Sequence, residues 1–270
     1  MKKVFLRVDS KGTQEKYRDG NYWYKKNHLG DEGMAEMLCS MVLRYSKMPS
    51  DVTYVNYEIA DFIIDEKIKH GCRSVNFLND GEEYISVQTL YFNLNKTEIE
   101  DKIFSIEDIG ERFAFACDFV KNATGLDNEF SDYLKTLISL DYFTRNPDRH
   151  WGNIGVIMRS DGSFRSCPIF DNGQAFGQNY NITPPDISYE KALEKLTSAT
   201  LCDSFENALK SIGGSVLQID FVGLTKDLSE IPDCSAKRFL DNRIIDCKKV
   251  FMQSIMDVQK SSIVNHKGGR

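Results

Sequence analysis

A polar run of eight residues, Asn146 to Asn153, stands between a helical pattern and a β pattern in the middle of the chain. The helical pattern covers residues 131 to 145. It must end at the proline of the polar run, because proline lacks an amide hydrogen and disfavours helix in the residue before it. The β pattern consists of Ile154 to Met158 and Phe164 to Phe170 on either side of Ser160-Asp161-Gly162-Ser163, which predicts a hairpin. The polar run is therefore a loop between two rigid elements.

The hairpin places two oxygen-bearing side chains near each other. If its turn is centred on Asp161-Gly162, Asn153 lies opposite Phe170, and Asn153 and Asp171 become diagonal neighbours across the two strands. Diagonal neighbours are about 7–8 Å apart at most. An amide and a carboxylate at that separation can share one Mg²⁺ at ~2.1 Å from each oxygen. The hairpin thus predicts a metal site made of Asn153 and Asp171.

The spacing of the polar residues is that of a phosphotransfer site. Asp148 precedes Asn153 by five residues, as the catalytic aspartate precedes the metal-binding asparagine in a protein kinase, and Asp171-Asn172-Gly173 stands where the metal-binding Asp-x-Gly would be. Asn-Pro-Asp and Asp-Asn-Gly are ordinary turn sequences when taken singly. Spacing, hairpin and upstream helix together favour chemistry, in which Asp148 orients a hydroxyl and metal neutralises phosphate charge.

The N-terminal part offers a phosphate-binding half. Residues 10 to 16 form a small polar stretch between two predicted strands, where backbone N–H groups could surround phosphates. Lys25 ends the second strand and Glu36 lies in the following helical pattern; a strand lysine paired to a helix glutamate holds nucleotide phosphates in kinases. The alternative is a solvated Lys25-Lys26 pair and a surface glutamate. The two lysines lie on opposite faces of the strand, and we favour Lys25.

Hydrophobic periodicity divides the chain into a β-rich and a helical part. Strands are expected at 4–8, at 21–26 and between 52 and 87, with one helix at 33–45. Helical patterns follow at 106–121, 131–145, 188–212 and 235–262. We expect an α+β chain with an N-terminal lobe over residues 1–80 and a larger, mainly helical C-terminal lobe over 81–270.

Composition excludes several classes of protein. A chain of 270 residues with 41% hydrophobic residues and 6 prolines has enough apolar material for a core and is not of the disordered class. Its net charge of −6 argues against a nucleic-acid partner. The 7 cysteines form no C-x-x-C pair, and neither a signal peptide nor a membrane-length apolar run is present. We therefore expect a cytoplasmic protein without disulfides and without a membrane partner.

The motifs resemble those of the HipA-like serine/threonine kinases, and in compactness the short CtkA-like members of that family. Residues 10–16 are similar to the family's Ser-x-x-Gly-x-Gln-Glu-Lys phosphate loop, although one residue shorter. Residues 146–153 resemble its Asn-x-Asp-x-His-x-x-Asn catalytic loop, 169–173 its metal-binding segment, and 33–36 the start of its lysine-pairing helix. The similarity extends from about residue 8 to residue 176 and is greatest in the catalytic loop.

The resemblance implies a two-lobed protein-kinase-like fold that binds ATP and Mg²⁺ in the cleft and transfers phosphate to a serine or threonine hydroxyl of a protein. It also implies an autophosphorylation site at Ser10. His150 is expected to pack behind the loop and hold Asp148 by a hydrogen bond, with direct proton transfer as the alternative. The resemblance also implies an antitoxin-like protein partner. The N-terminal subdomain of full-length HipA, however, has no counterpart before residue 10. The connector near residues 74–78 could contact adenine through Phe77, which could equally be a buried strand residue.

The expected site residues form three groups. The catalytic group is Asp148, Lys25, Glu36 and His150, the metal ligands are Asn153 and Asp171, and the nucleotide-binding group is Ser10, Gly12, Thr13, Gln14, Lys16, Lys25 and Phe77.

Two other functions compete with the kinase. A metal-dependent phosphoesterase could assemble Asp148, His150, Asn153 and Asp171 around divalent ions and activate water, although such sites usually contain more histidines than the 4 in this chain. A pseudokinase or toxin-type binding module would keep the fold and lack turnover.

Overall fold

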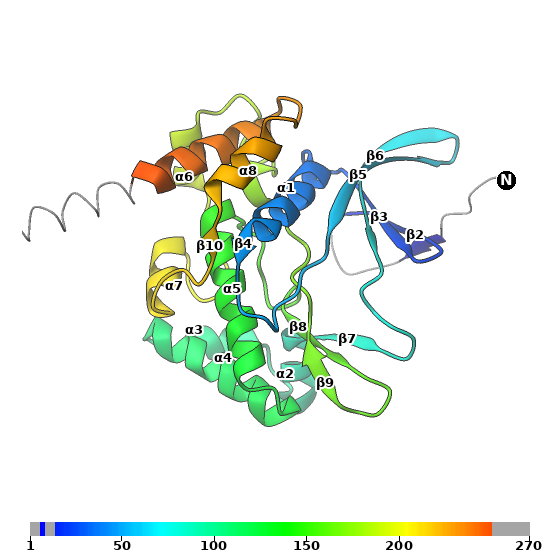
Figure 1. Ribbon diagram of the computed structural model, residues 1–270. Helices are drawn as coiled ribbons and strands as arrows, with labels where there is room; N and C mark the ends of the chain where they lie inside the picture. Colours follow the sequence, from blue (N-terminus) through cyan, green and yellow to red (C-terminus); the bar gives the residue numbers. More distant parts are fainter. Residues whose placement is uncertain (1–5, 9–13, 250–270) are drawn as a thin grey trace, which may run out of the picture.

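The computed structural model describes residues 6–8 and 14–249, and Figure 1 shows two lobes. One lobe is built on a five-stranded antiparallel sheet. In spatial order its strands are β1 (Leu6–Val8), β2 (Lys16–Asp19), β3 (Tyr22–Lys26), β6 (Lys67–Val75) and β5 (Tyr57–Ile64). The predicted strand at 21–26 is confirmed as β3. Strand β2 was not expected, because the sequence pattern placed Lys16 in a loop, whereas it pairs with Lys25.

Helix α1 (Glu32–Arg44) packs against this sheet and confirms the helix predicted at 33–45. The contact is close at two glycines. A Cβ atom on Gly33 would lie 2.6 Å from the carbonyl carbon of Gly71, and one on Gly71 would lie 1.9 Å from the Lys25 carbonyl oxygen. Only glycine lets the helix and the two strands approach this closely. The approach brings the helix face that carries Glu36 next to the strand that carries Lys25.

The second lobe is mainly helical. Helix α5 (Asn128–Thr144) runs through its middle and is buried along most of its length (Figure 1). Around it lie α2 (Val87–Asn95), α3 (Ile99–Phe104), α4 (Ile109–Thr124), α6 (Tyr189–Lys195), α7 (Phe205–Ser211), α8 (Phe221–Leu228), the short 3₁₀ helix η1 (Ala175–Gly177) and a helix over 235–249. Across the described ranges, no helix has the length and apolarity that crossing a membrane requires.

The prediction of one continuous helix over 188–212 is wrong. This range contains two helices, α6 and α7, and residues 196–204 between them are not helical. Each helix has its own serine cap: the Ser188 hydroxyl accepts from the Lys191 amide, and the Ser204 hydroxyl accepts from the Asn207 amide. A serine that caps satisfies the first free amides of a new helix and so favours a break before it. The helix predicted at 235–262 is described only to residue 249.

The predicted hairpin exists, but its register differs from the prediction. Strands β8 (Gly155–Met158) and β9 (Phe164–Ser166) pair Met158 with Phe164, and the Arg159 amide donates to the Ser163 carbonyl at 2.8 Å. The loop therefore contains three residues ending in a left-handed glycine, Gly162 at φ +82°, rather than a two-residue turn. The ladder shifts by one residue and ends at Ser166, so Asn153 does not pair with Phe170.

Residues 167–170 leave the hairpin and run beside the loop before β5. Tyr54 and Ile169 form an isolated parallel bridge, and the Val55 amide donates to the Ile169 carbonyl at 2.9 Å. On its other side β8 pairs with β7 (Glu83–Ser86), which completes a three-stranded sheet. Asp171 thus follows a segment that runs between the two sheets.

A further small sheet ties the end of α1 to the helical lobe. Strand β4 (Ser46–Lys47) pairs with β10 (Gln218–Ile219), and the Asp220 amide donates to the Tyr45 carbonyl at 2.7 Å. Between the end of β6 at Val75 and the start of β7 at Glu83 the chain passes from the first sheet to the second. We propose that the lobes divide near residue 80.

We expect Gly71→Ala to destabilise the fold, because its new Cβ would force β3 and β6 apart. The free energy of unfolding should fall by about 1–3 kcal/mol, the usual cost of overpacking. Urea denaturation followed by circular dichroism measures the change. Gly20→Asn is the matched control, because Gly20 has φ +58° and nothing within 4 Å of its Cβ position, and asparagine tolerates that conformation. Equal stability of Gly71→Ala and wild type would contradict the packing described here.

Candidate active site

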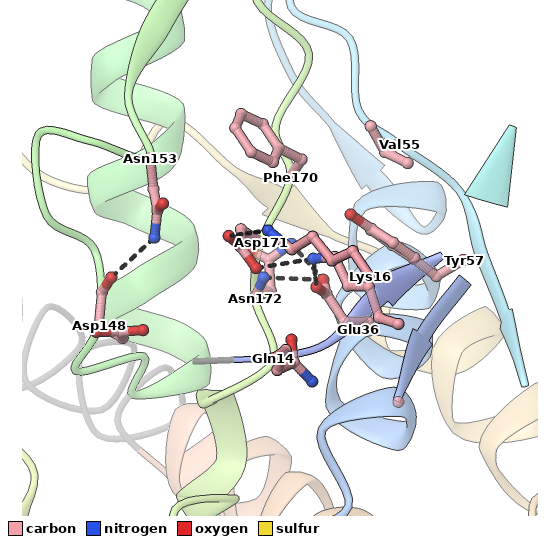
Figure 2. A network of polar contacts seen from close by, with 12 residues as sticks. Gln14, Lys16, Glu36, Val55, Tyr57, Asp148, Asn153, Phe170, Asp171 and Asn172 are labelled. Atoms are coloured by element: carbon pink, nitrogen blue, oxygen red, sulfur yellow. Dashed lines mark hydrogen bonds and ion pairs between the residues drawn. The ribbon is translucent and has the colours of Figure 1, made fainter. Parts of the chain in front are cut away.

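The catalytic-loop pattern folds immediately after α5. Arg145 ends the helix in the left-handed conformation, at φ +54°. The Asn146 side-chain oxygen then accepts the Asp148 amide at 3.2 Å, and the Asn153 side-chain nitrogen donates to the Asp148 carbonyl at 3.2 Å (Figure 2). Because its nitrogen is engaged, the Asn153 amide presents its oxygen as the available ligand atom. The loop thus orients the two polar residues that the sequence singled out.

Lys25, Glu36 and Asp171 form one buried network. The Lys25 ammonium donates to Glu36 Oε1 and, at 2.7 Å, to Asp171 Oδ1. The other Glu36 oxygen accepts the backbone amide of Asn172 at 2.8 Å. Lys25 is 7% exposed and Glu36 is fully buried, so the carboxylates compensate a charge that water hardly reaches. Lys16 adds a weaker contact, 3.8 Å from Asp171 Oδ2.

The network keeps Lys25 and Asp171 ionised. Burial alone would lower the pKa of the Lys25 ammonium, but the carboxylates of Asp171 and Glu36 outweigh it, and the pKa lies well above its usual range. Burial would likewise raise the pKa of Asp171, yet Lys25 and Lys16 hold it well below the ordinary value. Asp171 is therefore a carboxylate at neutral pH, as a metal ligand has to be.

The structure shows which of Lys25 and Lys26 pairs with Glu36. Lys26 lies on the other strand face, where its ammonium is 3.1 Å from Glu15 Oε1. Lys25 alone of the two reaches Glu36, so the expected pairing of a strand lysine with the α1 glutamate is present in the structure.

Arg149, which the sequence pattern did not single out, connects the predicted catalytic loop to the predicted metal-binding segment. Its guanidinium is 1% exposed and donates to the Phe170 carbonyl at 2.7 Å and to Asn172 Oδ1 at 2.5 Å. Its charge is compensated by Asp141 of α5, 3.1 Å away. Asp171 adopts φ +60°, which non-glycine residues rarely do, and Arg149 holds the carbonyls on both sides of that turn.

Asp148 is half-buried and lies within electrostatic reach of Asp171. Burial raises the pKa of its carboxyl, and the Asp171 charge raises it further, while His150 and Arg149 act in the opposite direction. One carboxylate oxygen, Oδ2, accepts a hydrogen bond from the Gln174 amide at 2.8 Å. Asp148 and Asp171 are therefore neighbours in one site, although the ladder predicted to join Asn153 and Asp171 is absent.

The expected position of His150 is wrong. Its side chain is exposed rather than packed behind the loop, and its ring Nδ1 accepts the Gly152 amide at 3.1 Å. Arg149 occupies the buried position instead. His150 is exposed between two buried residues, Arg149 and Trp151, and it is Arg149 that donates to the carbonyls of Phe170 and Asp171. The support for Asp148 comes from Gln174.

The predicted nucleotide-binding residues are described only in part. Ser10, Gly12 and Thr13 lie outside the described residues. Gln14 donates to the Lys26 carbonyl at 3.3 Å, and a Cβ on Gly173 would lie 3.4 Å from its side-chain oxygen. Gln14 thus sits beside the metal-binding segment, as Figure 2 shows.

Phe77 lies in the connector after β6 and not in a strand. Its ring packs on Phe170 with centroids 5.4 Å apart, next to a buried cluster of Val55, Tyr57 and Cys72. The Lys25 ammonium lies 5.0 Å from the centre of the Tyr57 ring, so this apolar cluster borders the charged network. The contact of Phe77 with adenine remains a prediction.

We expect Arg149→Met to lower the free energy of unfolding by about 3–5 kcal/mol, because it leaves the Asp141 carboxylate buried without a counterion. Chemical denaturation measures the loss. Arg238→Met, at an exposed pair with Asp233, should change stability by less than about 1 kcal/mol. Adding Asp141→Leu to Arg149→Met should recover part of the loss, since the stranded charge is then gone. A single variant as stable as wild type would contradict the assigned role.

Comparisons with known proteins bear on the fold. No protein-family model matches the sequence, and no curated protein matches it. Among solved structures, the proinflammatory kinase CtkA of Helicobacter pylori is similar over 90% of this chain and 90% of its own, with a TM-score of 0.59 and 15% sequence identity. HipA in the HipA–HipB–operator complex of Shewanella oneidensis MR-1 aligns over 90% of this chain and 65% of its own, with a TM-score of 0.48 and 10% identity. The CtkA match confirms the expected two-lobed architecture: the chain has a CtkA-like kinase fold.

Proposed function

We propose that this protein is an ATP- and Mg²⁺-dependent kinase that transfers phosphate to the hydroxyl of a serine or threonine in a protein. The observation that carries the proposal is the buried Lys25–Glu36–Asp171 network next to Asp148 and Asn153. A kinase needs a fixed cation for the donor phosphates, ligands for a metal and a base near the acceptor. These five residues supply all three.

Lys25 is the residue proposed to bind the donor phosphates. Glu36 and Asp171 fix its ammonium and keep it charged. Lys16 stands at the start of β2, directly opposite Lys25, and adds a second positive charge on the same side of Asp171. Phosphates that bind beside this pair would meet two cations.

The donor set fits a magnesium ion. Mg²⁺ is commonly held by one or two protein oxygen ligands together with substrate phosphates and water. Asp171 offers an ionised carboxylate and Asn153 offers an amide oxygen whose nitrogen is already engaged. When bound, the ion would neutralise charge on the transferring phosphate. Asp148 would orient the acceptor hydroxyl and receive its proton, and its raised pKa makes it a better base than an exposed aspartate.

Incubation with labelled ATP and Mg²⁺, followed by mass spectrometry of the protein, tests donor and chemistry together. A phosphoserine at Ser10 or elsewhere is the expected product. The same reaction with a lysate protein mixture tests acceptors in trans, including an antitoxin-like partner if one is supplied. A complete lack of phosphate transfer to any protein would count against the proposal.

We expect Asp148→Ala to reduce phosphate transfer by at least about 100-fold, because general-base assistance typically contributes that much. The fold should remain, since Asp148 is not a core residue. Transfer of labelled phosphate and the melting temperature are the two readouts. Asp118→Ala, on the exposed face of α4, is the control and should leave both unchanged. Full activity in Asp148→Ala would exclude the role given to this carboxylate.

Nucleotide binding distinguishes the kinase from the phosphoesterase. ATP with Mg²⁺ should raise the melting temperature, by an amount equivalent to about 2.7 kcal/mol at a hundredfold excess over Kd. Lys25→Met should abolish the ligand-induced rise and Lys26→Met, its neighbour on the other strand face, should retain it. Each rise is measured against the same variant without ligand. Metal-dependent hydrolysis of a phosphodiester without any ATP effect would favour the phosphoesterase, and ATP binding without transfer would favour the pseudokinase.

A further inference from the structure

Two amide side chains outside the catalytic loop form a chain that ends on Asp148. The Gln174 Nε2 atom donates to Asp148 Oδ2 at 2.8 Å, and the Asn179 Nδ2 atom donates to Gln174 Oε1 at 2.9 Å. Both amides belong to the segment that follows the metal-binding Asp171. This segment therefore holds the carboxylate from a side that the catalytic loop does not occupy.

We propose that Asn179 and Gln174 form an amide relay that positions Asp148 for phosphate transfer. The inference rests on the proposed kinase function and names two positioning residues for it. Neither amide touches the acceptor in this scheme; each acts through its neighbour.

The relay works because an amide has one donor end and one acceptor end. Asn179 donates to the oxygen of Gln174, so the nitrogen of Gln174 must face Asp148. If the Gln174 amide flipped, its oxygen would face a carboxylate oxygen and repel it. Asn179 thereby decides whether Gln174 attracts or repels the base.

Asn179 is itself fixed from two directions. Its side-chain oxygen accepts the Asn181 amide at 3.2 Å. Its carbonyl accepts the amides of Ile182 and Thr183, both at 2.9 Å. An amide with its oxygen engaged in a tight turn can present only its nitrogen to Gln174.

The segment that carries the relay is anchored to the loop before α1. The Tyr180 amide donates to the Leu29 carbonyl at 3.0 Å, and the buried Gln178 accepts the Asp31 amide at 3.2 Å. The same few residues thus set the start of α1, which carries Glu36, and the position of the base. In the described part of the chain the second oxygen of Asp148, Oδ1, accepts no hydrogen bond, which leaves it for the acceptor hydroxyl.

Two substitutions at Gln174 test the direct bond. Gln174→Ala removes a hydrogen bond to a charged acceptor and should lower kcat by roughly 10- to 100-fold. Gln174→Glu keeps the size of the side chain, replaces the donor by an acceptor and should lower kcat at least as much. The KM for ATP and the ATP-induced rise in melting temperature should stay as in wild type, because the hydrogen bonds of Gln174 do not involve Lys25. A fall in folding stability that explains the loss, or an unchanged kcat, would overturn the inference.

Asn179→Asp tests the orientation of the relay. The aspartate keeps the acceptor for the Asn181 amide but has no donor for Gln174. The Gln174 amide then loses the bond that fixes its orientation, and two carboxylates compete for its nitrogen. We expect a drop in kcat of about tenfold or more. In a Gln174→Ala background the same substitution should have no further effect on kcat, because no amide remains to flip. Additive losses in the double variant would contradict a relay and indicate a separate role for Asn179.

A readout without turnover separates this inference from the proposed function. The side-chain ¹⁵N–¹H resonances of Gln174, identified by their absence in Gln174→Ala, should shift in Asn179→Asp. A shift together with an inactive wild type would refute the kinase proposal and keep the hydrogen-bonded chain as a structural element only. An active wild type whose Gln174 resonances and kcat do not respond to Asn179→Asp would refute the relay and leave the kinase proposal standing.

Discussion

The buried ammonium of Lys25 is the interaction on which the rest of the site depends. A cation with 7% of its surface exposed must be compensated by carboxylates, and here one comes from α1 and the other from the segment that crosses to the helical lobe. Strand, helix and crossing segment cannot separate without leaving at least one charge unpaired in a poorly hydrated place. The need to compensate this charge therefore joins the sheet, the helix and the segment that carries Asp171 into one unit.

A second buried cation does the same for the catalytic loop. Arg149 ties the loop to Asp141 of α5 on one side and to the carbonyls of Phe170 and Asp171 on the other. Asn172 is bonded to both networks: its backbone amide donates to Glu36, and its side-chain oxygen accepts from Arg149. Asn172 is thus the residue through which the two networks meet. The left-handed turn at Asp171 persists because both networks hold it.

Local sequence patterns predicted β3, α1, α4, α5 and the two hairpin strands, and they singled out Lys25, Glu36, Asp148 and Asp171, because helix periodicity, strand faces and residue spacing are local properties. They did not predict α2 and α3. Lys25 and Glu36 were found since a strand and the next helix carry them. The hairpin register was missed because a three-residue loop and a two-residue turn contain the same turn residues, and a difference of one residue changes every pair. Arg149 and Gln174 were missed because their partners are far away in sequence, and nothing in a local pattern marks a side chain whose role is to satisfy distant carbonyls or a distant carboxylate. Strand β4 has two residues, too few to give any pattern, so its pairing with β10 could not be foreseen.

The way α1 is held has a consequence for how such a protein could be controlled. The residues just before α1, Leu29 and Asp31, are hydrogen-bonded to residues 178–180, and the residues just after it, Tyr45 and β4, are hydrogen-bonded to Asp220 and β10. Moving α1 away from β3 would therefore break the contacts at both of its ends as well as the Lys25–Glu36 ion pair. For the kinase proposed above, an off state would act on the nucleotide entrance or on the acceptor side, because displacing α1 would break hydrogen bonds at two separate places.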